Sequence, residues 1–225
     1  MGKIVKWALP AELTSSDVRP AADLLSEYFH ATREDGEPRY SGAKFETFRG
    51  GGDTSSAANV ITTDDLVAVS LLSVHVPGDA ALRILGAKAV DLAGLLERIP
   101  VYRELHEATD AQIGAKSAAN DLWRAVRKAG VGPVTTSKLL ARKRPKLLPV
   151  IDSVVQDTLK HPARGDFWLT LRESLKADEG RLYKHLLHIR DKAGIEEGVS
   201  IIRCFDVVVW RIGKRDGHGR KRGKY

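Results

Sequence analysis

The sequence predicts an all-α fold of about eight to ten short helices. Apolar residues recur three and four positions apart along most segments, which is the spacing of one helix face. No run alternates apolar and polar residues in the manner of a strand with one buried face. Capping residues, glycines and prolines stand where the periodic segments begin and end. We therefore expect one globular all-α domain over residues 1–212 and a disordered basic tail over residues 213–225.

The first half of the chain combines helical segments with one long irregular stretch. A first helix is expected to begin near Pro20 and to end before Gly36. Residues 33–59 lack a helical period, and a stretch of this length in a compact domain is either a ligand-contacting loop or a flexible linker. Thr62 and Asp65 have the spacing of a capping box. The residues that follow are apolar on nearly all sides, which indicates a central core helix.

The second half repeats the helical pattern. Helices are expected over residues 80–85, 89–99, 111–129, 133–142, 152–161, 167–175, 178–193 and 200–212. Asp206 lies inside the last of these, in the apolar run IIRCFDVVVW, and a buried carboxylate needs a partner. Arg203 lies three residues earlier and can serve on the same helix face. Cys204, in the same run, is expected to be a buried and unreactive thiol.

The composition excludes several classes of protein. Of the 225 residues, 43% are hydrophobic and 29% are charged, which is typical of a globular protein. No segment approaches the roughly 20 apolar residues of a membrane-spanning helix, and the N-terminus lacks the apolar core of a signal peptide. We therefore expect a cytoplasmic protein without membrane contact. The single cysteine excludes an internal disulfide and any all-cysteine zinc or iron–sulfur site, and no cofactor or metal is expected.

Basic residues are concentrated in two segments. Residues 122–151 hold eight basic residues and no acidic one, and residues 211–225 hold seven basic residues against one aspartate. These segments carry +8 and +6, against +7 for the whole chain, so the remainder carries −7. Such segregation of charge favours a partner rich in phosphate, nucleic acid above all. The alternative is that both basic segments are only solvated surface.

A glycine hairpin, Gly130-Val131-Gly132-Pro133, lies inside the first basic segment and joins two predicted helices. Glycine has no Cβ, so the chain can turn sharply there and bring its amides close to another surface. Pro133 suits the first position of a helix, and the amides at a helix N-terminus favour an anion. We expect this hairpin to hold a phosphate.

The segments GVGPVTTSKLL and PVIDSVV, with Asp152 twenty-two residues after Gly130, resemble the helix-hairpin-helix DNA glycosylase superfamily over about 30 residues. The resemblance implies an all-α fold whose hairpin holds a DNA phosphate. It also implies that Asp152 is the catalytic carboxylate and faces a cleft for a flipped-out base. Contacts with duplex DNA are expected from Gly130, Val131, Gly132, Thr135, Lys138, Arg142, Lys143 and Arg144, with the basic side chains on the outer face of the hairpin helices.

The chain departs from this superfamily at several positions. Val134 stands where bifunctional members have a lysine nucleophile, so no lyase step is expected from that position. Lys128-Ala129 replaces the Leu-Pro pair that often precedes the hairpin, and Ser153 follows the aspartate without the usual polar continuation. The chain is also similar to an uncharacterised group of bacterial proteins with no assigned function.

Three functions remain open from the sequence. The first is a monofunctional, glycosylase-like enzyme in which Asp152 stabilises positive charge on the sugar. The second is a non-catalytic DNA-binding module of the same fold, because an aspartate at a helix start is also a favoured N-cap. The third is a protein whose basic tail binds RNA or an acidic partner.

Overall fold

The computed structural model of the chain describes residues 3–163 and 165–218. Over these residues it is helical, with no strand and only two isolated β-bridges. Its α-helices are α1 (Arg19–His30), α2 (Thr63–Ser70), α3 (Gly78–Leu82), α4 (Ala89–Glu97), α5 (Asp110–Ile113), α6 (Ala118–Val126), α7 (Pro133–Lys143), α8 (Ser153–Thr158), α9 (Phe167–Lys192) and α10 (Ile201–Arg215). The predicted all-α class is confirmed. None of these helices combines the length and the hydrophobicity needed to cross a bilayer.

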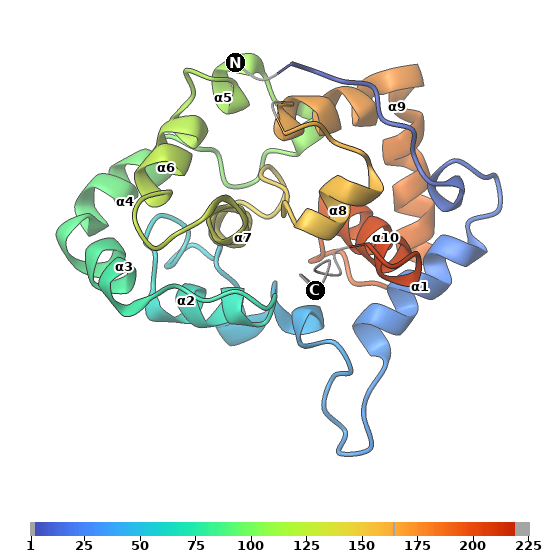
Figure 1. Cartoon of the computed structure of the whole chain (residues 1–225), viewed down its shortest axis with the longest axis horizontal. Helices are drawn as coiled ribbons and strands as arrows, with labels where there is room; N and C mark the ends of the chain where they lie inside the picture. The colour runs from blue at the N-terminus through green and yellow to red at the C-terminus, as the bar shows by residue number, and fades with distance from the viewer. Residues whose placement is uncertain (1–2, 164, 219–225) are drawn as a thin grey trace, which may run out of the picture.

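The helices form two groups with α7 and α8 between them (Figure 1). Helices α2 to α6 lie on one side, and α1, α9 and α10 lie on the other. The N-terminal α1 packs on both α9 and α10, and α10 also packs on α8. On the opposite side α4 packs on α6, and α7 contacts both α2 and α6. Helices α1 and α10 therefore belong to one group, the hairpin helix α6 belongs to the other, and the second hairpin helix α7 lies between them.

The segment expected to form one helix over residues 111–129 forms two, α5 and α6. The backbone leaves the helical path at Gly114, where an added Cβ would lie only 2.5 Å from the carbonyl oxygen of Asp110. Ser117 then caps α6, its hydroxyl accepting the Asn120 amide at 3.2 Å. The single-helix prediction is wrong because this cap restarts the helix in a new direction.

The two C-terminal helices differ from prediction mainly at their ends. Helix α9 leaves helical angles over residues 177–180, close to the break expected between residues 175 and 178. Helix α10 continues to Arg215. Gly213 is buried against α8, where an added Cβ would lie 2.1 Å from the Thr158 hydroxyl oxygen. The expectation of a disordered tail is therefore wrong for residues 213–215, while residues 219–225 lie outside the described part of the chain.

The long irregular segment before α2 is packed onto the helices. It contains two short 3₁₀ turns, Ser41–Lys44 and Phe48–Gly50, and the Phe45 side chain is buried. It ends at Thr62, which forms the predicted capping box with Asp65. Because its aromatic side chain and its carbonyls are engaged by the core, the structure argues against the linker interpretation of residues 33–59.

Candidate functional site

The glycine hairpin joins α6 to α7 as the sequence predicts. Gly130 has φ +85°, a left-handed conformation that favours glycine. The Val131 amide donates to the Lys128 carbonyl at 2.9 Å, and the Val131 side chain is buried. Gly132 has an extended backbone, with φ −77°, so only Gly130 of the two hairpin glycines has a positive φ. An added Cβ at Gly132 would meet open space, which leaves this face of the hairpin uncovered.

The start of α7 presents the features of an anion site. Pro133 occupies the first turn, and no side chain caps the helix. Thr135 is half-buried beside the turn, whereas Thr136 turns back and its hydroxyl donates to the Gly132 carbonyl at 2.9 Å. Arg127 and Lys128, just before the hairpin, are exposed. Helix N-termini attract anions, so the hairpin and these two cations form a small positive surface.

Four basic residues of α7 and its C-cap are not on the surface, which corrects the expected DNA contacts. Lys138, Arg142, Lys143 and Arg144 are 3%, 2%, 1% and 0% exposed. The prediction that these basic side chains lie on the outer face of α7 was wrong, because α7 runs into the middle of the molecule (Figure 1). There α2 and the irregular segment before it contact α7 and bind these cations. These four cations cannot reach a DNA backbone in this conformation.

Arg142 and Lys143 instead bind one buried carboxylate. Arg142 Nε lies 3.3 Å from Asp65 Oδ1, and Lys143 Nζ lies 2.8 Å from Asp65 Oδ2. The same Asp65 oxygen accepts the Thr62 amide at 2.9 Å, so the capping box of α2 and the cations of α7 share one group. Burial lowers the pKa of Lys143, and the Asp65 charge opposes that effect.

The same cations hold the irregular segment through its backbone. Arg142 donates to the carbonyls of Phe45 and Glu46 at 2.6 and 2.7 Å. Lys143 donates to the Ala57 carbonyl at 2.8 Å, and Arg144 to the Ala58 carbonyl at 2.7 Å. Buried polar groups must be hydrogen-bonded, and here each partner satisfies the other. The basic cluster therefore fixes residues 45–58 against α7.

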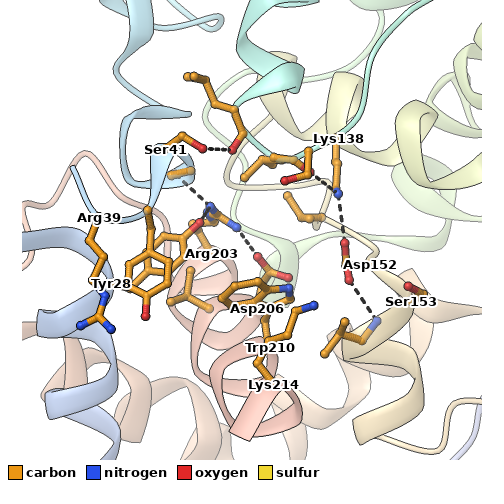
Figure 2. A pocket seen from close by; sticks show the side chains of 18 residues that line it. Tyr28, Arg39, Ser41, Lys138, Asp152, Ser153, Arg203, Asp206, Trp210 and Lys214 are labelled. Atoms are coloured by element: carbon orange, nitrogen blue, oxygen red, sulfur yellow. Dashed lines mark hydrogen bonds and ion pairs between the residues drawn. The ribbon is translucent and has the colours of Figure 1, made fainter. Parts of the chain in front are cut away.

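Lys138 connects the hairpin helix to Asp152. Its ammonium donates to Asp152 Oδ2 at 3.0 Å and to the Leu72 carbonyl at 2.8 Å (Figure 2). Val134, the position at which we noted a missing lysine, lies four residues earlier and therefore on the same side of α7. Lys138 therefore places a lysine beside Asp152, one helical turn after the position of Val134.

These residues line a cavity of about 350 Å³ between the two helical groups. Its walls come from α1, the turn at residues 39–42, the end of α2, and helices α7, α8 and α10 (Figure 2). The volume falls within the roughly 300–1,000 Å³ of small-molecule sites. We call this space the first cavity.

Asp152 has both of the roles that the sequence left open. Its Oδ1 accepts the Val154 amide at 2.9 Å, so it caps α8. Its Oδ2 accepts from Lys138, and the side chain, 18% exposed, lines the first cavity. Asp152 can cap α8 and line the cavity at the same time, because one carboxylate oxygen faces the helix and the other faces Lys138.

Asp206 is a second carboxylate of the first cavity, and it is absent from the site residues that the sequence indicated. It pairs with Arg203 as expected, and it is buried. Its Oδ1 has no hydrogen-bond partner among the described residues. Burial raises the pKa of Asp206 to about 6, Arg203 opposes this, and the nearby Asp152 charge adds to it. The signal was present in the sequence, because a carboxylate inside the apolar run IIRCFDVVVW is costly to bury unless it is paired.

Arg203 organises the floor of the cavity. Its guanidinium donates to the Tyr28 hydroxyl at 2.9 Å and to the Gly42 carbonyl at 3.1 Å. Its Nε lies 2.8 Å from Glu46 Oε1, and burial raises the pKa of that glutamate. Arg203 therefore faces two carboxylates, Glu46 and Asp206, which explains how one cation can hold both in the interior.

An aromatic wall and a cationic rim complete the first cavity. The rings of Tyr28 and Tyr40 are stacked, 5.1 Å apart at 16°, and Trp210 meets Tyr28 edge-on at 5.9 Å. Arg39 and Lys214 also line the cavity, and the Lys214 ammonium lies 5.5 Å from the Trp210 ring centre. Aromatic and acidic groups inside, with cations outside, suit a planar heterocycle attached to an anionic chain.

No group of three or more histidine, cysteine, aspartate or glutamate side chains is arranged to bind a metal in the part of the chain that the structure describes. Cys204 is buried as predicted, and burial raises the pKa of its thiol to about 12. The charged groups that line the first cavity are two carboxylates (Asp152, Asp206), two lysines (Lys138, Lys214) and two arginines (Arg39, Arg203).

A family of unknown function, DUF6308, matches residues 21–213. The chain belongs to this family. The DUF6308 range includes the hairpin, both carboxylates of the first cavity and the basic cluster of α7. No curated protein and no solved structure matches the chain.

Proposed function

We propose that this DUF6308 protein binds duplex DNA through its hairpin and hydrolyses the N-glycosidic bond of a base turned into the first cavity. The observation that carries the proposal is the position of Asp152. It lines a cavity of suitable size, and Lys138 ties it to the helix that begins at the hairpin. A phosphate held at the hairpin would bring a neighbouring nucleotide to this cavity.

The binding step relies on the hairpin amides and the exposed cations. The start of α7 is uncapped, and Arg127 and Lys128 lie beside it. Only a few phosphates are contacted, because Lys138 and the cluster at residues 142–144 are buried. Turning a base out of the duplex costs a few kcal/mol, least for a damaged pair, which favours a damaged or mismatched base as the substrate.

The chemical step relies on the two carboxylates. As the bond between C1′ and the base nitrogen breaks, its electron pair goes to the base and positive charge builds on the sugar. The Asp152 carboxylate stabilises that charge. Asp206, whose pKa of about 6 keeps part of it protonated near neutral pH, gives its proton to the leaving base. Water then adds to C1′ and returns a proton to Asp206, so the enzyme is restored.

A lysine adduct is not part of this proposal. The Lys138 ammonium is buried, with a carboxylate and a carbonyl as acceptors, and a protonated amine is not a nucleophile. The reaction is therefore hydrolysis without strand cleavage by the protein itself. The cytoplasmic location expected from the sequence stays a prediction.

The test is an excision assay on duplex oligonucleotides that each carry one damaged or mismatched base. We expect alkali-labile breaks at one class of base, and we expect Asp152→Asn to abolish them while duplex binding persists. If the wild-type protein produces no breaks across the panel and still binds duplex DNA, the hydrolase proposal is wrong.

That outcome would favour a second candidate, a non-catalytic DNA-binding module of the same fold. One observation supports it: both Asp152 oxygens already accept hydrogen bonds, from the Val154 amide and from Lys138. The tail-binding hypothesis concerns residues 213–225, of which residues 219–225 lie outside the described part of the chain.

A further inference from the structure

A second cavity, of about 440 Å³, lies next to the hairpin. We define it by six of its lining residues: Asn120, Trp123, Arg127, Val134, Gln156 and Trp168. These come from α6 and its C-cap, the start of α7, the middle of α8 and the start of α9. Arg127 and Pro133 line both this cavity and the hairpin surface, so a chain bound at the hairpin passes directly over it.

The wall of the second cavity is aromatic. The rings of Trp123 and Trp168 lie 5.7 Å apart and are nearly perpendicular, at 89°. Trp123 is only half-buried, so part of its ring is open to the cavity, whereas Trp168 is 6% exposed. Half-exposed tryptophans beside a cation are typical of sites on which unpaired bases stack.

Two polar groups of the second cavity lack partners among the described residues. The buried indole N–H of Trp168 has no acceptor among the described residues, and a buried donor without a partner is costly. Arg127 forms no ion pair within the described part of the chain. Asp166 also lines the cavity, but its Oδ1 accepts the Leu169 amide at 3.1 Å as the cap of α9. The free groups are therefore an indole donor and a cation.

We propose that the second cavity binds an unpaired nucleobase of the strand whose phosphate the hairpin holds. The base stacks on Trp123, one of its carbonyl or ring-nitrogen acceptors takes the Trp168 N–H, and Arg127 meets the adjoining phosphate. This site differs from the first cavity, which lies farther along α7 and contains Lys138. The inference rests on phosphate binding at the hairpin but not on base excision.

The test compares two short probes, an oligothymidylate and an abasic oligomer of equal length and charge. Binding is followed by fluorescence anisotropy of labelled probes. We expect the oligothymidylate to bind at least about fivefold more tightly, because stacking a base on an aromatic side chain strengthens binding by that much or more. Trp123→Ala should remove this preference without changing affinity for the abasic oligomer, and Arg127→Gln should weaken both probes.

Two further variants keep the test decisive. Trp168→Phe keeps one aromatic ring in this buried position and removes the pyrrole ring with its N–H, so it should reduce the base preference while the protein stays folded. Trp210→Phe changes the first cavity and should leave the preference intact. Equal affinities for the two probes, failure of both to bind, or a preference lost in Trp210→Phe but not in Trp123→Ala would each overturn the proposal. Excision activity plays no part in any of these outcomes.

Discussion

Lys138 and Asp152 form a partly buried ion pair of 3.0 Å that joins the second helix of the hairpin to the start of α8 (Figure 2). The pair sets the position of the carboxylate in the first cavity, because Lys138 is itself anchored on the Leu72 carbonyl. The helix that begins at the hairpin and the carboxylate that faces the cavity are therefore joined by one ion pair. The proposed function relies on this pair to hold Asp152 in place relative to the hairpin.

Substitutions of Asp152 should separate its cap from its chemistry. Asparagine is as good an N-cap as aspartate, so Asp152→Asn keeps the cap of α8, but it leaves the Lys138 ammonium without its carboxylate and should lower the free energy of unfolding by about 3 kcal/mol. Asp152→Ala should lower it by about 1 kcal/mol more, because the Val154 amide also loses its acceptor. Urea denaturation measures both values. If Asp152 stabilises the sugar cation, excision activity should fall to background in both variants. Excision activity that survives in Asp152→Asn would show that Asp152 serves only as the cap of α8.

The buried cluster around Asp65 should behave as structure and not as a DNA surface. Asp65→Asn leaves Arg142 and Lys143 without their shared carboxylate, and breaking a buried pair in this way costs about 3–5 kcal/mol. The segment at residues 45–58, which those cations hold, should become sensitive to trypsin at Arg49. Denaturation and limited proteolysis check these outcomes. A variant that stays as stable as the wild type would mean that the cluster contributes nothing to the fold.

The salt dependence of DNA binding should depend on the exposed cations beside the hairpin. Arg127→Gln and Lys128→Gln should each reduce the slope of log affinity against log salt by about 0.9, since each removes one phosphate contact. Both side chains are exposed, so the free energy of unfolding should be unchanged. Lys192→Gln is the matched control, because this exposed lysine lies at the end of α9, in the helical group that does not contain α6 (Figure 1). Equal slopes in all three variants would argue against a phosphate site at the hairpin.

The sequence predicted the fold class and the hairpin because both depend on local patterns. Helical spacing, the capping box at Thr62 and the glycine turn are set by neighbours in the chain. The exposure of the α7 cations could not be predicted in that way. Arg142 meets Asp65, which lies 77 residues earlier, so its burial depends on which distant segment covers the helix. A run of basic residues has the same appearance in either environment.

The site in the first cavity could also be predicted only in part from the sequence. Asp152 was found from its spacing to the hairpin, and the Arg203–Asp206 pair was expected from burial. Their convergence was not predictable, because α8 and α10 come together only through tertiary packing. Lys138 was not predicted to be the partner of Asp152 for a related reason. The superfamily pattern places its lysine at the position of Val134, but residues four apart share a helix face, so Lys138 lies on the same side of α7.

A lysine adduct should not form on abasic DNA. Lys138 is the lysine of the first cavity that lies beside Asp152, and its ammonium already has two acceptors. Sodium borohydride should therefore trap no covalent complex between the protein and an abasic duplex at neutral pH, and denaturing gels should show free protein only. A trapped band that disappears in Lys138→Gln would show that the amine loses its proton and attacks the sugar, and hydrolysis without an adduct would then be the wrong mechanism.

The pH dependence of stability should report the state of Asp206. Its pKa is raised from 3.8 to about 6 in the folded protein, so the folded state binds the proton more tightly than the unfolded state. The contribution of Asp206 to the free energy of unfolding is therefore most favourable below about pH 4 and is lost as the pH rises through 6. Over that window the wild type should lose about 3 kcal/mol relative to Asp206→Asn, since one pKa unit corresponds to about 1.4 kcal/mol.

Urea denaturation of both proteins between pH 4 and pH 7 measures this difference directly. In the excision assay, the same proton should make the wild-type rate fall as the pH rises above 6, and Asp206→Asn should be slow and independent of pH over that range. The two readouts are linked, because the proton that stabilises the buried carboxyl is the one that the leaving base receives. A stability difference that stays constant from pH 4 to pH 7 would mean that Asp206 remains ionised beside Arg203, and it would remove Asp206 as the proton donor.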